Sequence, residues 1–308
     1  MKTLAIVVPC YNEEETIPPF LEACQAVERQ MGNQLIFNYY FVNDGSKDRT
    51  LDVLRQVSKQ FENVHYLSFS RNFGKEAALY AGLQRATGDY VTVMDADLQD
   101  PPELLIEMYA KIQEGYDVVG TRRADRKGEP PIRSLFAKAF YWLINKVSDT
   151  EMVDGARDFR LMTRQVVDAI LELKEVNRFS KGLFSWVGFD VAYVSYENRE
   201  RVAGETSWSF WKLLNYSLDG FINFSEVPLK LATWAGTFSF LISLVGIFFV
   251  VIRKLTIGGS VAGWASLVSI ILFIGGIQLL ALGIIGNYIS KIFLETKKRP
   301  VYIVKEKG

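Results

Sequence analysis

The chain has 308 residues, 49% of them hydrophobic and 23% charged, which is enough for one large buried core plus an appendage. Its 35 basic and 35 acidic side chains balance, so no overall charge excess points to nucleic acid, and an anionic ligand has to be held by local groups. Two cysteines, Cys10 and Cys24, are too few for a disulfide framework or a zinc site. The single histidine, His65, lies in an apolar run, which argues against histidine-based catalysis.

The first 121 residues alternate between apolar runs of strand length and helical segments. Residues 50–57 and 77–83 have helical character, and the strand-length runs cover residues 4–9, 37–43, 64–69, 90–95 and 117–121. This alternation predicts an α/β fold with a mostly parallel, Rossmann-like sheet covered on both faces. The N-terminal segment turns acidic after one short apolar run, unlike a secretory signal peptide, so we expect this domain in the cytoplasm.

Polar side chains follow the predicted strands, at the edge where parallel α/β sheets bind their ligands. The triplets 11–13, 44–46 and 95–97 come directly after strands, as does the pair 71–72. The first strand is not followed by GxGxxG, and the chain has no Walker lysine loop, so a dinucleotide enzyme and a P-loop ATPase are disfavoured.

Asp95 and Asp97 stand one residue apart at the end of a predicted strand. If the backbone stays extended there, both carboxylates point the same way, about 7 Å apart. Hard oxygen ligands of this kind select Mg²⁺ or Mn²⁺, which would neutralise a diphosphate leaving group. Two solvated turn aspartates are the alternative reading of so short a pattern.

Basic residues precede and line an amphipathic segment downstream of the last of these strands. Its apolar face contains Leu135, Phe136 and Leu143, and its basic residues are Arg122, Arg123, Arg126, Arg133 and Lys138. They form either a solvated basic face or a cradle for a phosphate, for which arginine forks are suited.

Two long uncharged stretches dominate the C-terminal third. Residues 231–252 carry no charge and make about 33 Å of helix, enough to cross a bilayer core. Residues 255–290 are also uncharged, with glycines at 258, 259 and 263 that suggest a turn before a second span at 264–288. A transmembrane hairpin is the prediction, and a pair of buried core helices is the alternative.

The segments beside this hairpin complete the predicted organisation. Aromatic residues at helical spacing in 208–224 predict a helix on the membrane surface, and basic residues after 290 agree with a cytoplasmic tail. The tail motif RPVYIVKE predicts one short strand. The predicted regions are a cytoplasmic α/β domain (1–207), an interfacial region (208–228), two transmembrane helices (229–290, spanning 229–253 and 264–288) and a tail (291–308).

Four motifs occur in a fixed order: VVPCYNEEE, VNDGSKDRT, SRNFGKEAALYAGL and DADLQDPPE. Together they resemble the family 2 glycosyltransferases with the GT-A fold. The subgroup resembled is the polyprenyl-phosphate sugar transferases, which includes dolichyl-phosphate mannose synthases and bacterial bactoprenol glucosyltransferases. The resemblance covers nearly the whole chain, including the two C-terminal spans.

The resemblance implies roles for individual residues. Pro9, Tyr11, Glu13 and Asp44 would line the nucleoside pocket, and Asn43 replaces the first of a frequent aspartate pair. Asp95 would bind the donor diphosphate through a metal that Asp97 and Gln99 also hold. Arg122 and Arg133, ahead of Arg126 and Lys138, would hold the acceptor phosphate. Asp154 and Asp158 would lie near the acceptor, with Asp158 orienting the nucleophile or acting as base, while Arg201 would reach the donor phosphates.

The function implied is inverting, metal-dependent transfer of one sugar, UDP-glucose being the favoured donor, to undecaprenyl or another polyprenyl phosphate. The site of action would be the bacterial cytoplasmic membrane, and the hairpin could also support a homo-oligomer. A processive polysaccharide synthase is one alternative, although the QxxRW motif is absent from the sequence. A non-catalytic nucleotide-sugar-binding subunit or a small transporter is another, although the stretches 231–252 and 264–288 contain no charged residue.

Overall fold

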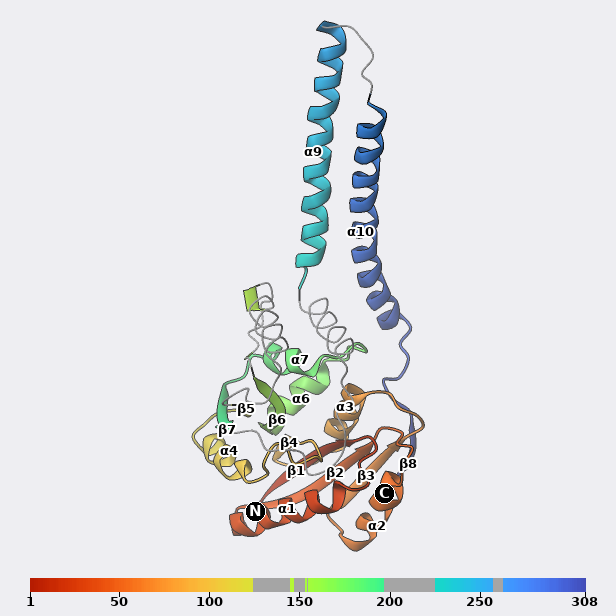
Figure 1. Cartoon of the computed structure of the whole chain (residues 1–308). Helices are drawn as coiled ribbons and strands as arrows, with labels where there is room; N and C mark the ends of the chain where they lie inside the picture. Colours follow the sequence, from red (N-terminus) through yellow and green to blue (C-terminus); the bar gives the residue numbers. More distant parts are fainter. Residues whose placement is uncertain (124–144, 147–152, 154, 197–224, 257–262) are drawn as a thin grey trace. The chain divides into compact units, whose positions relative to one another are not determined.

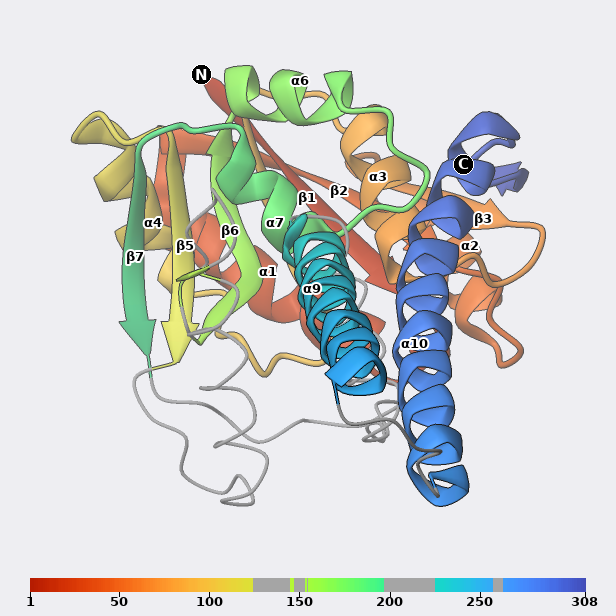
Figure 2. The same ribbon diagram turned by 90° about the horizontal axis from the view of Figure 1, so that it is seen from above.

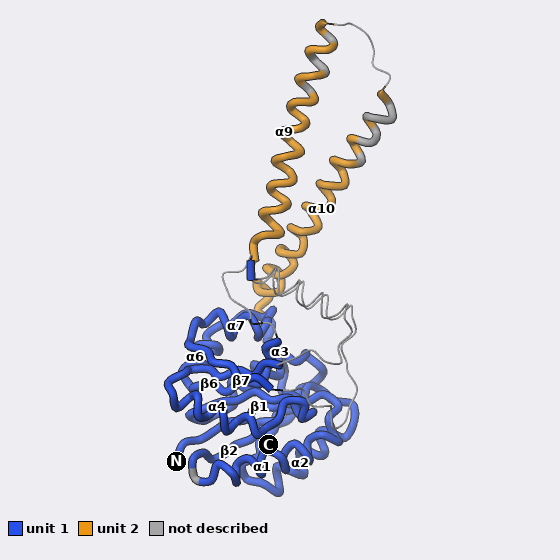
Figure 3. Tube along the Cα trace, turned by 60° about the vertical axis from the view of Figure 1, so that its left-hand side comes forward, with its two compact units in different colours: residues 1–220, 299–308 blue, residues 221–298 orange. Residues whose placement is uncertain are grey.

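The computed structural model describes residues 1–123, 145, 146, 153, 155–196, 225–256 and 263–308. The chain divides into two compact units, each described by itself below (Figures 1 and 3). Unit 1 comprises residues 1–220 and 299–308, and unit 2 comprises residues 221–298. The chain therefore leaves unit 1, forms unit 2 and returns to unit 1 for its last ten positions.

Unit 1 is built on one eight-stranded sheet, in the order β7-β5-β6-β4-β1-β2-β3-β8. Pairs β1–β2, β1–β4, β2–β3 and β5–β7 are parallel, and β6 and β8 run antiparallel to their neighbours. The strands are β1 (Lys2–Cys10), β2 (Leu35–Asn43), β3 (Val64–Phe69), β4 (Tyr90–Val93), β5 (Val118–Arg123), β6 (Ala156–Thr163), β7 (Val191–Tyr196) and β8 (Val304–Lys307).

Helices cover both faces of the sheet, which explains why its central strands are apolar without interruption. Along β1, Leu4, Ile6 and Val8 join one core cluster, whereas Ala5 and Val7 join the cluster on the other face. The first face is covered by α1 (Ile17–Met31), α2 (Thr50–Gln60) and α4 (Leu104–Gln113), and the second by α3 (Lys75–Arg85), α6 (Arg164–Glu172) and α7 (Ser180–Trp186).

Much of this was predicted from the sequence. The GT-A-like, mostly parallel sheet is confirmed, as are the five N-terminal strands and the short C-terminal strand. Cys10 and Cys24 are buried and unbonded to each other, and His65 packs its ring against Tyr40 at 5.1 Å. Two strands, β6 and β7, were not foreseen because neither shows a clean apolar alternation.

One geometric expectation was wrong. Strand β4 ends at Val93, and Ala96 and Asp97 lie in a turn in which Leu98 has a positive φ of 56°. The backbone is therefore not extended through Asp95 and Asp97, and their carboxylates do not project in parallel from one strand. The turn at Ala96 and Asp97 lies between the two aspartates, so their directions do not follow the alternation of a strand.

Unit 2 consists of α9 (Val227–Thr256) and α10 (Trp264–Thr296), which contact each other. The hydroxyl of Tyr288 donates to the carbonyl of Ser225 at 2.6 Å, joining the start of the unit to α10. Two segments, Val227–Gly246 and Phe273–Thr296, are long and apolar enough to cross a membrane. Their large side chains are exposed, Trp234 at 71% and Leu279 at 72%, so the buried-core-helix alternative does not apply to these segments.

Candidate active site

The turn after β2 organises the donor side of the predicted site. Asp44 is 3% exposed, and its two carboxylate oxygens accept the backbone N–H groups of Phe73 and Gly74 at 2.6 and 2.9 Å. Burial raises the pKa of Asp44, and the two backbone hydrogen bonds counteract part of that rise. Gly45 has a φ of +64°, and a Cβ there would lie 2.3 Å from the backbone of Arg71, so this turn packs directly against the loop 70–74.

The neighbouring Asn43 has a structural task. Its side-chain amide donates to the hydroxyl of Ser68 at 3.0 Å, and its carbonyl oxygen accepts the N–H of Ser46 at 3.1 Å. An aspartate in this buried position would have no side-chain N–H group to donate to the hydroxyl oxygen of Ser68. Asparagine therefore fits the local hydrogen bonds of β2 and β3.

The other predicted nucleoside residues lie at the end of β1 and in the segment that follows it. Pro9 pairs in register with Val42, and Tyr11 is exposed just beyond β1. The backbone N–H of Glu13 donates to Thr50 at 2.8 Å, and its carboxylate accepts the hydroxyl of Thr16 at 2.7 Å. A cavity of about 430 Å³ opens beside them, lined by residues 12–16, 47 and 48.

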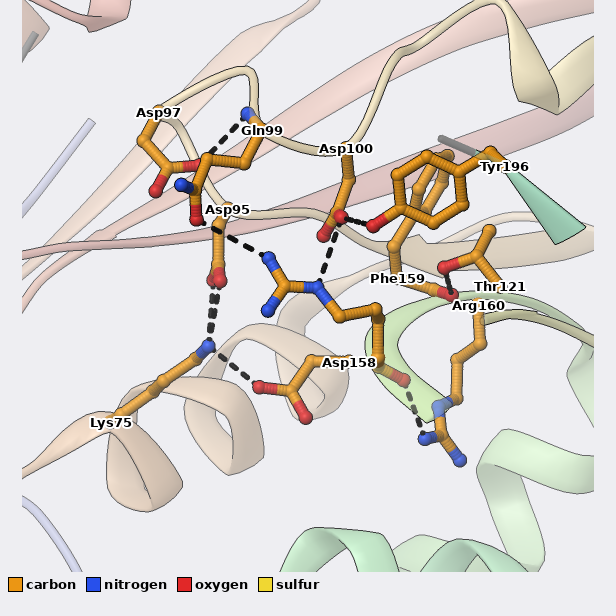
Figure 4. Close-up of polar contacts among 11 residues, drawn as sticks. Lys75, Asp95, Asp97, Gln99, Asp100, Thr121, Asp158, Phe159, Arg160 and Tyr196 are labelled. Atoms are coloured by element: carbon orange, nitrogen blue, oxygen red, sulfur yellow. Dashed lines mark hydrogen bonds and ion pairs between the residues drawn. The ribbon is translucent and has the colours of Figure 1, made fainter. Parts of the chain in front are cut away.

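Strand register brings together two carboxylates that are distant in sequence. Strands β4 and β6 are antiparallel with Val93 opposite Arg160, so Asp95 and Asp158 continue that register beyond the strand end. The ammonium of Lys75, the first residue of α3, lies between them (Figure 4). Its Nζ is 2.8 Å from Asp95 Oδ1 and 2.7 Å from Asp158 Oδ2, which makes one ionic bridge across three elements.

The charges of this bridge are mutually stabilised. Burial alone would lower the pKa of Lys75, but the charges of Asp158 and Asp95 outweigh it and raise that pKa above 10.5. For Asp158, burial would raise the pKa, but Lys75 and then Lys181 hold it well below 3.8. The side chains of Lys75 and Asp158 keep 35% and 22% of their surface exposed, so a ligand can still reach them.

A second cluster is centred on Arg157. This residue donates through Nε to Asp100 at 3.1 Å and through Nη2 to the side-chain oxygen of Gln99 at 3.4 Å. Asp100 also accepts the phenol of Tyr196. Burial alone would lower the pKa of Arg157, but Asp100, Tyr196 and Asp95 raise it, so the guanidinium remains charged.

The predicted metal ligands fit the chemistry of a hard divalent ion without forming a complete cage. Asp95, Asp97 and Gln99 offer only oxygen donors, which Mg²⁺ and Mn²⁺ prefer. Within the described ranges, no cluster of three or more His, Cys, Asp or Glu side chains has metal-binding geometry. Asp97 accepts the N–H of Gln99 at 3.2 Å, and Asp95 has an ammonium against it. The acidic group therefore suits an ion that arrives with its own phosphate ligands.

The structure places only part of the predicted acceptor site. Arg122 lies on β5 and donates to the hydroxyl of Ser195 on β7 at 3.1 Å. The other predicted acceptor residues, Arg126, Arg133, Lys138 and Asp154, lie outside the described residues, and so does Arg201, which was predicted to reach the donor phosphates. Sequence reasoning missed Lys75, Arg157 and Tyr196, although Lys75 stands inside the motif SRNFGKEAALYAGL. Lys75 and Asp158 are 83 residues apart in the sequence, so no local pattern indicates that they form an ion pair.

Comparison with known proteins identifies the family. The model of Glycosyl transferase family 2 matches residues 5–171. The chain belongs to glycosyltransferase family 2. CsbB of Bacillus subtilis, provisionally described as a glycosyltransferase, is 46% identical over 98% of this chain and 91% of its own length. The bactoprenol glucosyl transferase of Shigella phage SfX is 41% identical over 99% of each chain.

Among solved structures, mannosyl-3-phosphoglycerate synthase from Rubrobacter xylanophilus covers 71% of each chain at 20% identity, with a TM-score of 0.48. The sequence relatives and the family model establish that this protein is a glycosyltransferase.

Proposed function

We propose that this glycosyltransferase moves a single sugar from a nucleotide sugar, with UDP-glucose favoured, to undecaprenyl or another polyprenyl phosphate. The bactoprenol glucosyl transferase that aligns over 99% of both chains supports a lipid acceptor and a glucosyl donor. The proposed location is the cytoplasmic face of a bacterial cytoplasmic membrane.

The observation that carries this proposal is the bridge Asp95–Lys75–Asp158. Asp95, proposed for the donor side, and Asp158, proposed for the acceptor side, both contact the ammonium of Lys75, at 2.8 and 2.7 Å. A transferase has to bring two anionic substrates, a diphosphate and a lipid phosphate, to one point, and cations interleaved with carboxylates suit that task. Lys75 and Arg157 flank the acidic turn from its two sides.

On the donor side, Asp95 and Asp97 would hold the metal, with the side-chain oxygen of Gln99 available as a further ligand. A bound Mg²⁺ or Mn²⁺ would neutralise charge on the departing nucleoside diphosphate. Lys75 then remains beside Asp158, and Arg201 is proposed to meet the donor phosphates. The nucleoside pocket is proposed to be lined by Pro9, Tyr11, Glu13 and Asp44. The carboxylate of Asp44 accepts two backbone hydrogen bonds, so about two of its roughly four acceptor positions remain for a ligand.

On the acceptor side, the chemistry needs no strong base. A phosphate monoester has a second pKa near 6 and is mostly a nucleophilic dianion at neutral pH. The low pKa of Asp158 makes it a poor proton acceptor, which favours an orienting role over a general-base role. Arg122, Arg126, Arg133 and Lys138 are proposed to hold the lipid phosphate while it attacks the anomeric carbon. A single displacement of this kind inverts the anomeric configuration.

The proposed membrane arrangement uses α9 and α10 as a hairpin and residues 208–228 as an interfacial region. The exposed apolar side chains of both helices support burial in lipid. Because β8 pairs with β3, the chain returns to the sheet of unit 1 after α10, which supports placing both ends of the hairpin on one side. Association of hairpins into a homo-oligomer is part of this proposal.

A substrate panel tests the proposed function. Purified full-length protein is incubated with undecaprenyl phosphate, MgCl₂ or MnCl₂, and one nucleotide sugar at a time. The mass of the extracted lipid is then measured by mass spectrometry. We expect one added hexose, with UDP-glucose giving the highest rate. A series of longer chains would favour a processive synthase, and no modified lipid with any donor would contradict transferase activity on this acceptor.

The stereochemical part has its own test. NMR of the lipid product reports the anomeric configuration, which we expect to be opposite to that of the donor. Retained configuration, or a glycosyl-enzyme trapped by rapid denaturation, would contradict the single displacement.

A further inference from the structure

The tail after α10, residues 301–308, is built into the catalytic sheet. Its strand β8 pairs antiparallel with β3, with Leu67 opposite Lys307 and Phe69 opposite Val304. The pairing continues beyond both ends of the strand. The N–H of Ser70 donates to the carbonyl of Ile303 at 3.0 Å, and Gly308 exchanges backbone hydrogen bonds of 3.0 and 2.9 Å with Tyr66. The tail therefore holds the start of the loop that follows β3.

Side chains fasten this tail at two places. Glu306 accepts both Nε and Nη2 of Arg55 at 2.8 and 2.6 Å and the phenol of Tyr66 at 2.7 Å. The hydrogen bonds from Arg55 and Tyr66 lower the pKa of Glu306 to about 2, so it stays ionised at neutral pH. Near the other end of the tail, the hydroxyl of Tyr302 donates to Gln84 of α3 at 2.9 Å.

A row of aromatic rings leads from the tail to Asp44. The ring of Tyr302 stacks on Phe69 with centroids 4.9 Å apart, and Phe69 meets Phe73 edge to face at 5.7 Å. Phe73 is also the residue whose backbone N–H donates to Asp44 at 2.6 Å. The tail thus touches the loop on one side, and the loop grips the Asp44 carboxylate on the other.

The loop 70–74 has little freedom to move independently of these contacts. The absent Cβ of Gly45 would lie 2.3 and 2.6 Å from the backbone of Arg71 and Asn72, so the loop and the Asp44 turn are in direct contact. Lys75, which bridges Asp95 and Asp158, follows the loop immediately. A shift of the loop would therefore displace both the Asp44 contacts and the bridging ammonium.

We propose that the tail 301–308 is a positioning part of the donor site, with Tyr302 as the residue that sets the loop 70–74 and, through it, Asp44 and Lys75. The proposal rests on the proposed function in taking this sheet edge as the donor site. A tail that merely covers the edge of β3 against unwanted strand pairing would contribute stability alone. A positioning tail controls donor binding most strongly, and it reaches the acceptor carboxylate Asp158 only indirectly, through Lys75.

The test uses full-length protein and four variants. Tyr302→Leu removes the stacking, and Glu306→Gln loosens the far anchor. Tyr302→Phe keeps the stacking without the hydroxyl, and Ile303→Ala trims an exposed side chain of the same segment. Calorimetry with UDP and MgCl₂ measures donor-side affinity, initial rates give KM for the lipid acceptor, and hydrogen exchange follows the amides of Phe73 and Gly74.

We expect Tyr302→Leu to weaken UDP binding about three- to tenfold, within the range of effects that packed networks transmit, and to accelerate exchange at Phe73 and Gly74. Glu306→Gln should show the same pattern to a smaller degree. Tyr302→Phe and Ile303→Ala should stay within about twofold of wild type in UDP affinity. In Tyr302→Leu and Glu306→Gln the acceptor KM should change less than the UDP affinity, because the loop reaches Asp158 only through Lys75.

Three further outcomes separate this inference from the proposed function. Unchanged exchange at Phe73 and Gly74 in Tyr302→Leu and Glu306→Gln overturns the inference, whatever nucleotide the site takes. Asp44→Asn serves as the benchmark: if it weakens UDP binding while Tyr302→Leu does not, the inference fails and the donor site stands. If wild-type protein and Asp44→Asn bind UDP equally well, the proposed nucleoside pocket fails instead.

Discussion

The two halves of the catalytic sheet are organised differently. In the half proposed to bind the donor, called the donor half below, β1 to β4 are parallel and the proposed residues Asp44 and Asp95 follow the strand ends. In the half proposed to bind the acceptor, the acceptor half, β6 runs antiparallel, and Asp158 stands near its beginning, where register alone places it opposite Asp95. Lys75 contacts both Asp95 and Asp158. The proposed donor residues can therefore be found by local pattern, whereas the proposed acceptor carboxylate depends on long-range pairing.

The largest effect that sharpens this comparison is expected at Asp158. Asp158→Asn leaves Lys75, Lys181 and Arg160 without the carboxylate that they share, so we expect kcat for lipid transfer to fall by about 10²-fold or more. UDP affinity, which belongs to the other half, should change less than about threefold. Steady-state kinetics and calorimetry measure these two quantities. A UDP affinity that fell as steeply as kcat would contradict the assignment of Asp158 to the acceptor half alone.

The bridge itself can be tested by a double-mutant cycle with Lys75→Met. Because Lys75 pairs with both carboxylates, the single variants Lys75→Met and Asp158→Asn should not have additive effects on kcat, with a coupling of about 1–3 kcal/mol. Lys75→Arg, which keeps the charge, is the matched control and should retain more activity than Lys75→Met. Additive losses would mean that the bridge plays no part in transfer.

A substitution at Asp44, in the donor half, should change UDP affinity and leave the acceptor KM almost unchanged. Asp44→Asn places an NH₂ donor where two backbone N–H groups already donate, so we expect the Kd for UDP to rise about tenfold. The acceptor KM should stay within about twofold. Calorimetry and lipid titrations measure both, and an effect confined to the acceptor would contradict the assignment of Asp44 to the donor half.

The sequence predicted the donor half better than the acceptor half for physical reasons. The apolar runs of β1 to β4 are buried on both faces, and the polar residues that follow them mark the ligand edge. Strand β6 carries Arg157, Asp158 and Arg160 among its first five residues, so it does not read as a strand. The pairs Lys75–Asp158 and Arg157–Asp100 join residues distant in sequence, and only the fold brings them together.

The smallest expected effect is the pH dependence of the bridge. The pKa of Asp158 is depressed below 3.8, so its contribution is present above that pH and is lost as pH falls through the folded-state value. The pKa of Lys75 is raised above 10.5, so its contribution is present below that pH and is lost only as pH rises further. Between about pH 5 and 9 the bridge should not titrate, and kcat/KM should instead fall below about pH 6, where the acceptor phosphate becomes protonated.

A pH–rate profile with Asp158→Asn as control checks this assignment. The acid limb near pH 6 should keep its midpoint in the variant, because it belongs to the lipid. A midpoint that moved with the substitution would show that Asp158 titrates in that range and would restore it as a general base.

The most direct test of the central claim is lipid glycosylation by the double variant Asp95→Ala with Asp97→Ala, compared with wild-type protein that is equally folded and purified. Because the two carboxylates are proposed to hold the ion that carries the activated sugar, we expect transfer to undecaprenyl phosphate to fall by about 10³-fold or more. Mass spectrometry of the extracted lipid measures this. A double variant that glycosylates the lipid at the wild-type rate would contradict the proposed site.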